Sequence, residues 1–532
     1  MADVEADVAI VGTGPTGAAA AWRLATRGFN VVCIERGDWI GPADIPTSAP
    51  DYELLRRGPW HANPNIRRWP VDMPVDDADS PIKPMVGHAV GGSSIWWSAH
   101  MPRFRPDDFA MRTRDGVGED WPIGYADLVP WFELNETEIG LAGATGDPSA
   151  PQRANALRQL PPIGPCGRRF AAAFDRLGWH WWPVDLTLGR AEDGDQPCTH
   201  VGPCDVGCPA RRRQSADAIY LRRAIAAGAR LLTGMRALEL EHDASGRVSA
   251  LVCARDGGRM RVRARRFMLA ANGMGTPRLL LLSRSGAFPD GLANRSGLVG
   301  RNLMLHPYAK VEGLFDAPLG TWTPGLKAGI VSFEFFATRR AHDFVRGFKL
   351  QLNFGPRPIA LSQGATLGEA LPFGPAHHVE FERRFDRIAG ISVCAEDLPE
   401  PDNRISLSPD RVDIDGLPAP KWTYRLSANS RRSLDFGMAR AAEALREAGA
   451  TELFRTPLQR DAGFHIMGTA RMGTDPGMSV VDPFGLCHDS PNLYVVDASV
   501  FVTSSSANPT ATAQALALRA ADHLADRARL AA

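Results

Sequence analysis

The chain has 532 residues, of which 44% are apolar and 23% are charged, and its 60 basic residues balance its 60 acidic residues. This length exceeds one ordinary core, so it predicts two or three folding units that can enclose a large ligand. The balanced charge excludes a general attraction to nucleic acid, and no apolar run approaches the roughly eighteen residues that a membrane span needs. We therefore expect a soluble globular protein with neither nucleic-acid partners nor an integral membrane segment.

The N-terminal segment bears on the expected location. It runs from Met1 into a strand pattern by Val8, without the basic, apolar and small-residue regions of a secretory signal. We expect a cytoplasmic protein. The alternative is a periplasmic or membrane-associated location reached through a partner subunit.

A β-α-β unit opens the chain. Apolar residues 8–11 predict a strand, residues 18–27 a helix, and residues 30–35 a second strand. This order predicts an α/β fold built on a parallel, helix-covered sheet.

The turn between the first strand and the helix carries Gly12, Gly14 and Gly17, and Glu35 follows eighteen residues after the last of these glycines. The first glycine permits a tight turn, the second lets a pyrophosphate approach the backbone, and the third lets helix and strand pack closely. Amides at the start of the helix would hold the phosphates, and Glu35 would accept hydrogen bonds from ribose hydroxyls. The motif predicts a bound dinucleotide but does not distinguish FAD from NAD.

Later segments divide the chain. Residues 39–84 lack periodicity and predict a long surface excursion that covers a ligand. Residues 265–283 repeat the order strand, glycine turn and helix, so the first domain resumes there. We expect a dinucleotide-binding domain over 1–306 and 461–532, with a cysteine-containing loop at about 196–212. Residues 307–460 alternate like strands, contain no phosphate-type loop and predict a separate substrate-binding domain.

The C-terminal part carries the family resemblance. The segments FHIMGTARMG (464–473) and NLYVVDASVFVTSSSANPTATAQALALRAADHL (492–524) resemble signatures of the glucose-methanol-choline (GMC) oxidoreductases. Further segments agree in order along the chain, namely the loop at Gly12, AVGGSS at Ala89, AANGMGTPRLLLLS at Ala270 and VGRNLMLHP at Val299. The resemblance implies the GMC fold, a Rossmann-like FAD-binding domain with a largely antiparallel substrate-binding domain.

Two active-site residues are implied by this resemblance. His465 matches the family's catalytic histidine, and Asn508 matches a second position that holds His or Asn. Removal of a hydride from an alcohol requires the hydroxyl proton to leave as well, and a neutral imidazole can accept that proton. We expect His465 to be the base and Asn508 to orient the hydroxyl, with hydride passing to flavin N5. His306 and the pair at 377–378 have no comparable support and are interpreted as structural.

The resemblance also implies contacts with FAD. The residues concerned are Gly91, Gly92 and Ser93, near the flavin ring, and Asp497 and Ala498, near the ribityl chain and pyrophosphate. Some family members attach FAD covalently through a histidine shortly after the glycine pair. Here the stretch reads Ser-Ile-Trp-Trp, so non-covalent FAD is expected.

Three cysteines form the spacing C-x5-C-x3-C-P at Cys198, Cys204 and Cys208. Three thiolates in a short loop suit an iron-sulfur cluster, whereas zinc would want a fourth ligand such as His200 and a disulfide would leave one thiol over. The chain is most similar to iron-sulfur-containing bacterial FAD-dependent glucose, fructose and gluconate dehydrogenase subunits, which implies a cluster of the [3Fe-4S] type. The basic residues after Pro209 and the stretch 91–96 depart from those enzymes, which leaves the sugar undefined.

We therefore predict an FAD-dependent dehydrogenase that oxidises a CH-OH group of a sugar, polyol or sugar-derived alcohol. Its electrons would pass through the cluster to a cytochrome, a quinone or another acceptor, with a small or electron-transfer subunit as a further partner. The alternatives are a GMC oxidase that uses O2, an aminosugar, glycoside or other alcohol dehydrogenase of secondary metabolism, and a non-redox lyase of the same family. An electron-transfer module without substrate chemistry conflicts with the presence of His465 and Asn508.

Overall fold

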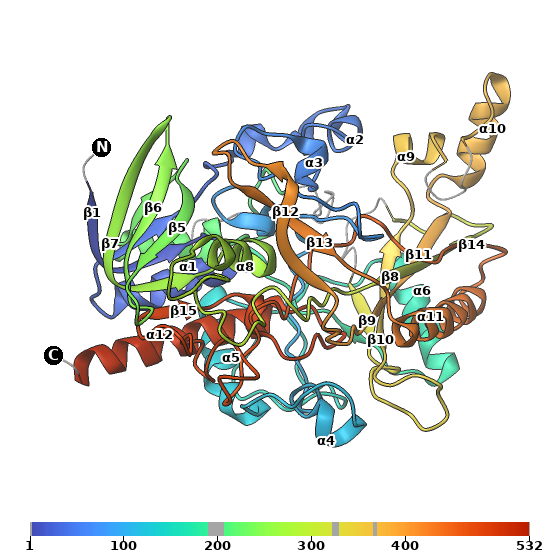
Figure 1. Ribbon diagram of the computed structural model, residues 1–532. Coiled ribbons are helices and arrows are strands. Elements are labelled where there is room, and N and C mark those ends of the chain that lie inside the picture. Colours follow the sequence, from blue (N-terminus) through green and yellow to red (C-terminus); the bar gives the residue numbers. More distant parts are fainter. Residues whose placement is uncertain (1–2, 190–206, 322–328, 365–369, 531–532) are drawn as a thin grey trace.

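A computed structural model describes residues 3–189, 207–321, 329–364 and 370–530 (Figure 1). The predicted opening unit is present as β1 (Val4–Val11), α1 (Pro15–Thr26) and β2 (Val31–Ile34). Alternate residues of β1 enter two different cores: Val8 and Ile10 pack with α1 and the C-terminal helix, whereas Ala9 and Val11 pack on the opposite face. A strand buried on both faces reads as a continuous apolar run, which is the pattern of residues 8–11.

The first sheet combines distant parts of the chain. Its order is β4 (Arg230–Leu232), β2, β1, β7 (Gly258–Leu269), β6 (Val248–Arg255) and β5 (Arg236–His242), and β15 (Leu493–Val495) also pairs with β7. Strands β4, β2, β1, β7 and β15 are parallel, whereas β5, β6 and β7 form an antiparallel extension. The C-terminal strand thus returns to the sheet that the N-terminus began.

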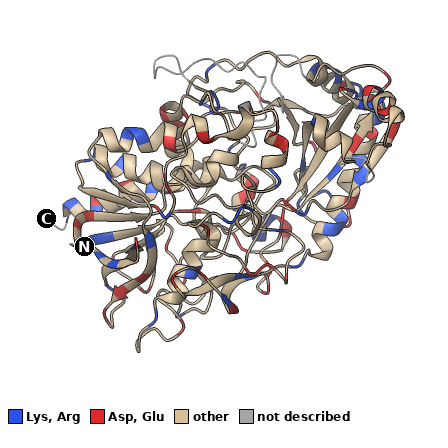
Figure 2. Cartoon of the chain, turned by 90° about the horizontal axis from the view of Figure 1, so that it is seen from above, with Lys and Arg blue, Asp and Glu red and all other residues tan. Residues whose placement is uncertain are grey.

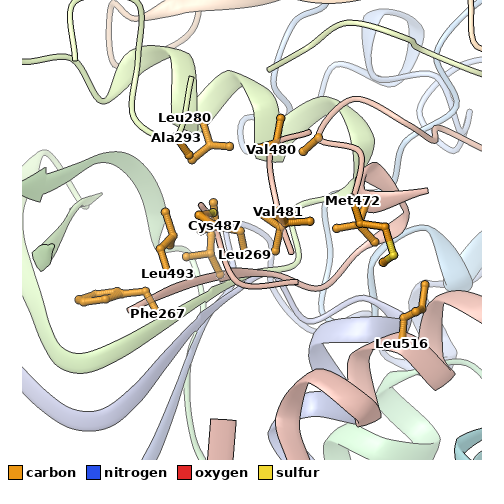
Figure 3. Packing of buried hydrophobic residues seen from close by; sticks show 14 of the residues in the cluster. Phe267, Leu269, Leu280, Ala293, Met472, Val480, Val481, Cys487, Leu493 and Leu516 are labelled. Carbon is orange, nitrogen blue, oxygen red and sulfur yellow. The ribbon is translucent and has the colours of Figure 1, made fainter. Parts of the chain in front are cut away.

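Helices cover both faces of this sheet. α8 (Asn272–Leu282) follows β7, and α12 (Thr510–Leu530) lies against α1 and α5 (Tyr125–Ile139). Figure 3 shows Phe267 and Leu269 of β7 and Leu493 of β15 near Leu280 of α8, with Leu516 of α12 at the edge of the same cluster. This packing anchors the loops at the carboxyl ends of the parallel strands.

The second sheet is antiparallel. Its order is β14 (Glu452–Thr456), β8 (Tyr308–Leu314), β11 (Ile388–Ala395), β10 (Phe348–Phe354), β9 (Ile330–Ser332) and β3 (Trp182–Pro183). α6 (Pro165–Leu177) and α11 (Ala428–Glu447) pack on its apolar face. The helix α6 and the strand β3 precede the predicted boundary at residue 307, yet they pack on this sheet.

Shorter helices and a two-stranded hairpin complete the described fold. They are α2 (Tyr52–Leu55), α3 (Pro64–Arg67), α4 (Met111–Asp115), α7 (Arg222–Ala226), α9 (Pro358–Ser362), α10 (Pro375–Arg384), β12 (Arg404–Val412) and β13 (Pro418–Thr423). The hairpin β12–β13 runs between the sheets in Figure 1, and α10 projects from the end of the second sheet. Together, the two sheets and their helices form the predicted α/β architecture, with one largely parallel and one antiparallel sheet.

Basic and acidic side chains are interspersed over the molecule (Figure 2). This mixture agrees with the zero formal net charge of the sequence. Within the described residues, no helix combines the length and apolar character needed to cross a membrane.

Candidate active site

A cavity of about 1390 Å³ is lined by residues from both sheets and from the predicted surface excursion. Most of the predicted site residues that the structure describes line it: Gly12, Gly14, Glu35, Gly92, Ser93, Cys208, His465, Asp497, Ala498 and Asn508. Gly17 and Gly91 do not line the cavity. They lie in the glycine loops that form part of its wall.

The first glycine loop is shaped by close backbone contacts. Gly12 has φ +96°, and a Cβ there would lie 2.4 Å from the Ala270 carbonyl oxygen. A Cβ on Gly17 would lie 2.1 Å from the Gly12 carbonyl oxygen. These contacts leave the start of α1 open to the cavity, where its free amides can hold an anion.

The second glycine loop meets the first. Gly92 has φ +58°, and a Cβ there would lie 3.0 Å from the Gly14 Cα. The Ser93 hydroxyl accepts a hydrogen bond from the Gly87 amide at 3.0 Å. Since neither glycine projects a side chain into the gap, the two loops form a narrow cradle suited to a pyrophosphate and a flat ring.

Glu35 stabilises the first glycine loop through hydrogen bonds. Its carboxylate accepts hydrogen bonds from the Thr13 amide at 3.0 Å, the Thr13 hydroxyl at 2.8 Å and the Gly37 amide at 3.1 Å. A carboxylate has about four acceptor positions, so one remains for a ribose hydroxyl. The neighbouring Arg36 also lines the cavity, and its buried Nε has no hydrogen-bond partner among the described residues. Sequence reasoning did not single out Arg36.

Asp497 joins two segments of the cavity wall. It accepts from the Ser499 amide at 2.9 Å and from the Thr276 hydroxyl of α8 at 2.5 Å. Burial raises the pKa of this carboxyl group, while the hydrogen bonds from Ser499 and Thr276 oppose that rise. Asp497 therefore lines the cavity and also links α8 to the C-terminal segment of its wall.

His465 contacts a second histidine. Its Nδ1 lies 2.8 Å from Nδ1 of His306, and His306 Nε2 lies 3.1 Å from the Ser504 carbonyl oxygen. A carbonyl oxygen only accepts, so His306 Nε2 carries a hydrogen, and the Nδ1 of a neutral His306 is an acceptor. The neutral His465 then donates from Nδ1, which leaves the lone pair on its Nε2 for another molecule.

The electrostatic surroundings keep His465 neutral. Burial lowers its pKa well below the ordinary value, and His306, Lys349 and His100 lower it further. A neutral imidazole in contact with the cavity can accept a proton at neutral pH.

The orientation of Asn508 is set by Lys349 of β10. The Lys349 ammonium donates to the Asn508 Oδ1 at 2.5 Å, and both side chains are buried. Because the lysine occupies the oxygen, the amide NH2 of Asn508 is left as the group that can meet a ligand. Asn508 lines the cavity, whereas Lys349 lies behind it.

The second sheet presents a polar face to this cavity. Residues opposite one another on β10, β11 and β8 form two cross-strand rows: Gln351, Ser392 and Lys310, then Asn353, Gly390 and Glu312. All of these residues except Gly390 line the cavity. Lys310 and Glu312 form an ion pair at 2.6 Å, and the buried Oε1 of Gln351 has no partner among the described residues. The wall therefore suits a ligand that carries several hydrogen-bonding groups.

Only part of the predicted cysteine cluster can be located. Cys198 and Cys204 lie outside the described residues, and Cys208 lines the cavity. Within the described ranges, no group of three or more His, Cys, Asp or Glu side chains is arranged to hold a metal ion.

Comparison with known proteins identifies the family. The models of GMC oxidoreductases match residues 10–308 and 399–517. The chain therefore belongs to the GMC oxidoreductase family. FAD, which this family binds, fits the cradle between the glycine loops and the remaining acceptor position of Glu35. It also fits the Arg36 Nε, which has no partner in the described part of the chain.

Individual relatives cover almost the full chain. It is 35% identical to a 2-methyl-1,2-propanediol dehydrogenase of Mycolicibacterium austroafricanum, over 98% of this chain and 96% of the relative. It is 31% identical to the fructose dehydrogenase large subunit of Gluconobacter japonicus, over 98% and 97%. It is 31% identical to a paromamine 6'-oxidase of Streptomyces fradiae, over 98% and 91%.

Solved structures share the fold. A pyridoxine 4-oxidase from Mesorbium loti superposes with a TM-score of 0.65 at 19% identity, over 97% of this chain and 98% of that one. A formate oxidase variant of Aspergillus oryzae superposes with a TM-score of 0.69 at 15% identity, over 99% of both chains. These comparisons confirm the predicted GMC fold.

Sequence reasoning did not identify two residues that contact His465 and Asn508. His306 was interpreted as structural, although it lies in the family segment VGRNLMLHP, and the structure places it against His465. Lys349 alternates with apolar residues in FKLQLNF, which indicates a lysine on the polar face of a strand. Neither pattern shows which distant residue the side chain meets.

Proposed function

We propose that the protein is an FAD-dependent dehydrogenase that oxidises a CH-OH group of a sugar, polyol or sugar-derived alcohol to a carbonyl. The observation that carries this proposal is the hydrogen-bonded chain from Ser504 through His306 to His465, which leaves a neutral imidazole nitrogen for the substrate. FAD, when bound between the two glycine loops, supplies the acceptor for the hydride that leaves the alcohol carbon.

The side chains of this protein handle the proton and the oxygen. His465 Nε2 accepts the proton of the substrate hydroxyl as the C–H bond breaks. The Asn508 NH2 donates to the same oxygen and stabilises the negative charge that develops on it, because Lys349 occupies the amide oxygen. His306 keeps the base in the required tautomer without contacting the substrate.

The polar sheet face supports a hydroxylated substrate. Gln351, Asn353 and Ser392 line the cavity with amide and hydroxyl groups, and the free acceptor of Gln351 would take a hydrogen bond from a substrate hydroxyl. The relatives named for a propanediol and for fructose support the same class of substrate.

The test is anaerobic flavin reduction by a panel of alcohols, polyols and sugars. We expect bleaching of the flavin absorbance with polyhydroxylated compounds, and a loss of about 100- to 10,000-fold in its rate in His465→Ala. An unbleached flavin across the panel would leave the non-redox lyase as the better explanation. A wild-type rate in His465→Ala would refute the role of the base.

We also propose that Cys198, Cys204 and Cys208 hold an iron-sulfur cluster. Iron and sulfide analysis of anaerobically purified protein tests this assignment. The C-x5-C-x3-C spacing and the cavity-lining position of Cys208 support this second part, which would give electrons a route to a non-oxygen acceptor. Relatives named as oxidases favour the alternative of O2 as acceptor. Iron-free protein that produces hydrogen peroxide at its full turnover rate would establish that alternative.

A further inference from the structure

His100 is a buried polar residue that the proposed mechanism does not use. It follows the second glycine loop, is 3% exposed and lines the same cavity as His465 and Asn508. Neither Nδ1 nor Nε2 of its ring has a hydrogen-bond partner among the residues that the structure describes. Buried polar atoms in folded proteins nearly always have partners, so two unpaired nitrogens on a cavity wall indicate a ligand that pairs with them.

The backbone holds this ring at a fixed position. His100 forms a β-bridge with Leu186, and the Met101 amide donates to the Asp185 carbonyl at 2.9 Å. The preceding Ala99 has φ +61°, a left-handed conformation that is rare for a residue with a Cβ. Strained residues of this kind persist where the surrounding structure enforces them, often at ligand sites.

The neighbours of His100 include residues of the proposed catalytic centre. Burial and the nearby ammonium of Lys349 lower its pKa to about 3, so the ring is neutral. Lys349 also contacts Asn508, and His100 itself contributes to the electrostatic environment of His465. His100, His465 and Asn508 therefore line the same cavity, with the Lys349 ammonium behind it.

A neutral imidazole offers one donor and one acceptor. A hydroxyl group offers the same pair, so one hydroxyl can complete the hydrogen bonding of either nitrogen. A cationic group on the ligand would be repelled by Lys349, whereas a hydroxyl would not. The hydroxyl that is oxidised is already bound by His465 and Asn508, which leaves a second, adjacent hydroxyl as the partner of His100.

We propose that His100 binds a second hydroxyl of the substrate, on the carbon next to the one that is oxidised, and thereby selects vicinal diols and polyols over simple alcohols. This inference rests on the proposed function. It assigns His100 to substrate recognition, while the bond-breaking step stays with His465.

The experiment uses purified, FAD-loaded protein and two matched pairs of substrates that differ by one hydroxyl. They are 1,2-propanediol with 1-propanol and D-glucose with 2-deoxy-D-glucose, added to anaerobic enzyme within a broader alcohol panel. For the pair that reacts, we expect the wild type to prefer the vicinal diol by about 10- to 100-fold in kcat/KM. His100→Ala should lose that preference, because its kcat/KM should fall far more on the vicinal diol than on the partner without the second hydroxyl.

Two further variants separate recognition from folding. His100→Asn retains a donor and an acceptor and should recover part of the preference. The control His378→Ala changes an exposed histidine of α10 and should alter neither rate. FAD content and flavin absorbance should be unchanged in all three variants.

Other outcomes would overturn the inference. An equal loss on both members of a pair, with a shifted flavin spectrum, would assign the ring to the flavin. A wild type that reduces its flavin equally with diols and simple alcohols would refute the role of His100 and leave the proposed function intact. A flavin that no alcohol in the panel bleaches would refute both proposals.

Discussion

His306 Nδ1 lies 2.8 Å from His465 Nδ1, although the two residues are 159 positions apart in the sequence. His306 Nε2 lies 3.1 Å from the Ser504 carbonyl, so this nitrogen carries a hydrogen and the Nδ1 of a neutral His306 accepts from His465. The arrangement makes His306 a positioning residue for a base that faces the cavity.

Replacement of His306 should reduce turnover without removing the base. In His306→Ala the His465 ring loses its Nδ1 partner and its fixed tautomer, so we expect kcat to fall about 10- to 100-fold. His306→Gln, which can still accept at this position, should recover part of the loss. Steady-state kinetics of both variants beside His465→Ala provides the measurement. An unchanged kcat in His306→Ala would contradict the positioning role.

The pH profile should reflect the lowered pKa of His465. Burial and the neighbouring His306, Lys349 and His100 disfavour the protonated ring, so the base stays neutral well below pH 6.5. Activity should therefore persist through neutral pH and be lost only as the pH falls through the lowered pKa. The acid limb of kcat/KM against pH reports this pKa in the free enzyme. An acid limb at or above pH 6.5 would contradict the expectation.

Removal of the Lys349 charge should shift the acid limb of the kcat/KM profile to higher pH. In Lys349→Met the repulsion on protonated His465 disappears, so the pKa of His465 rises and the acid limb shifts to higher pH. We also expect kcat to fall about 10- to 100-fold because the Asn508 amide is no longer held. Lys421→Met is the matched control, since Lys421 pairs with Asp79 on the surface. Equal pH profiles in both variants would refute the coupling.

A substitution at Gly14 should reduce FAD binding without lowering the stability of the fold. Gly14→Ala adds a methyl group whose nearest atom is 4.0 Å away, on Gly92, so the fold should tolerate it while the cradle is filled. We expect a melting temperature close to that of the FAD-free wild type and a strongly reduced flavin-to-protein ratio. Full flavin occupancy in this variant would show that the cofactor does not enter the gap.

Gly12→Ala should instead destabilise the protein. Its Cβ would meet the Ala270 carbonyl at 2.4 Å at a residue with φ +96°. Gly28→Ala is the control, because Gly28 has φ +87° with no atom within 4 Å of the added carbon. The control should cost about 1 kcal/mol in the free energy of unfolding and Gly12→Ala clearly more, as measured by denaturant titration.

Arg346 links the two halves of the molecule through buried carboxylates. Its guanidinium pairs with Glu396 at 2.9 Å, with Asp115 at 3.3 Å and with Asp108. Arg346→Met leaves these acidic groups unpaired, so we expect a loss of about 3–5 kcal/mol in the free energy of unfolding. Arg383→Met removes an exposed ion pair with Glu380 and should cost less than about 1 kcal/mol. Similar losses in the two variants would argue against a stabilising role for the buried network.

The sequence by itself determined the parts of the molecule that depend on local chemistry. The glycines at 12, 14 and 17 predicted the turn between β1 and α1, and at Gly12 and Gly17 only glycine fits the backbone contacts there. Apolar runs and their periods predicted β1, α1 and β2 to within a few residues. Motif context also selected His465 and Asn508, and the structure brings both to one cavity.

Only the tertiary structure decided which distant residues meet. Alternation in β10 indicates a polar face with Lys349 on it, but the contact with Asn508 depends on how the second sheet lies against the C-terminal segment. Likewise, His306 and His100 have no local pattern that distinguishes them from ordinary buried histidines. Hydrogen bonds between segments more than a hundred residues apart follow from the packing of the two sheets, which no short sequence window contains.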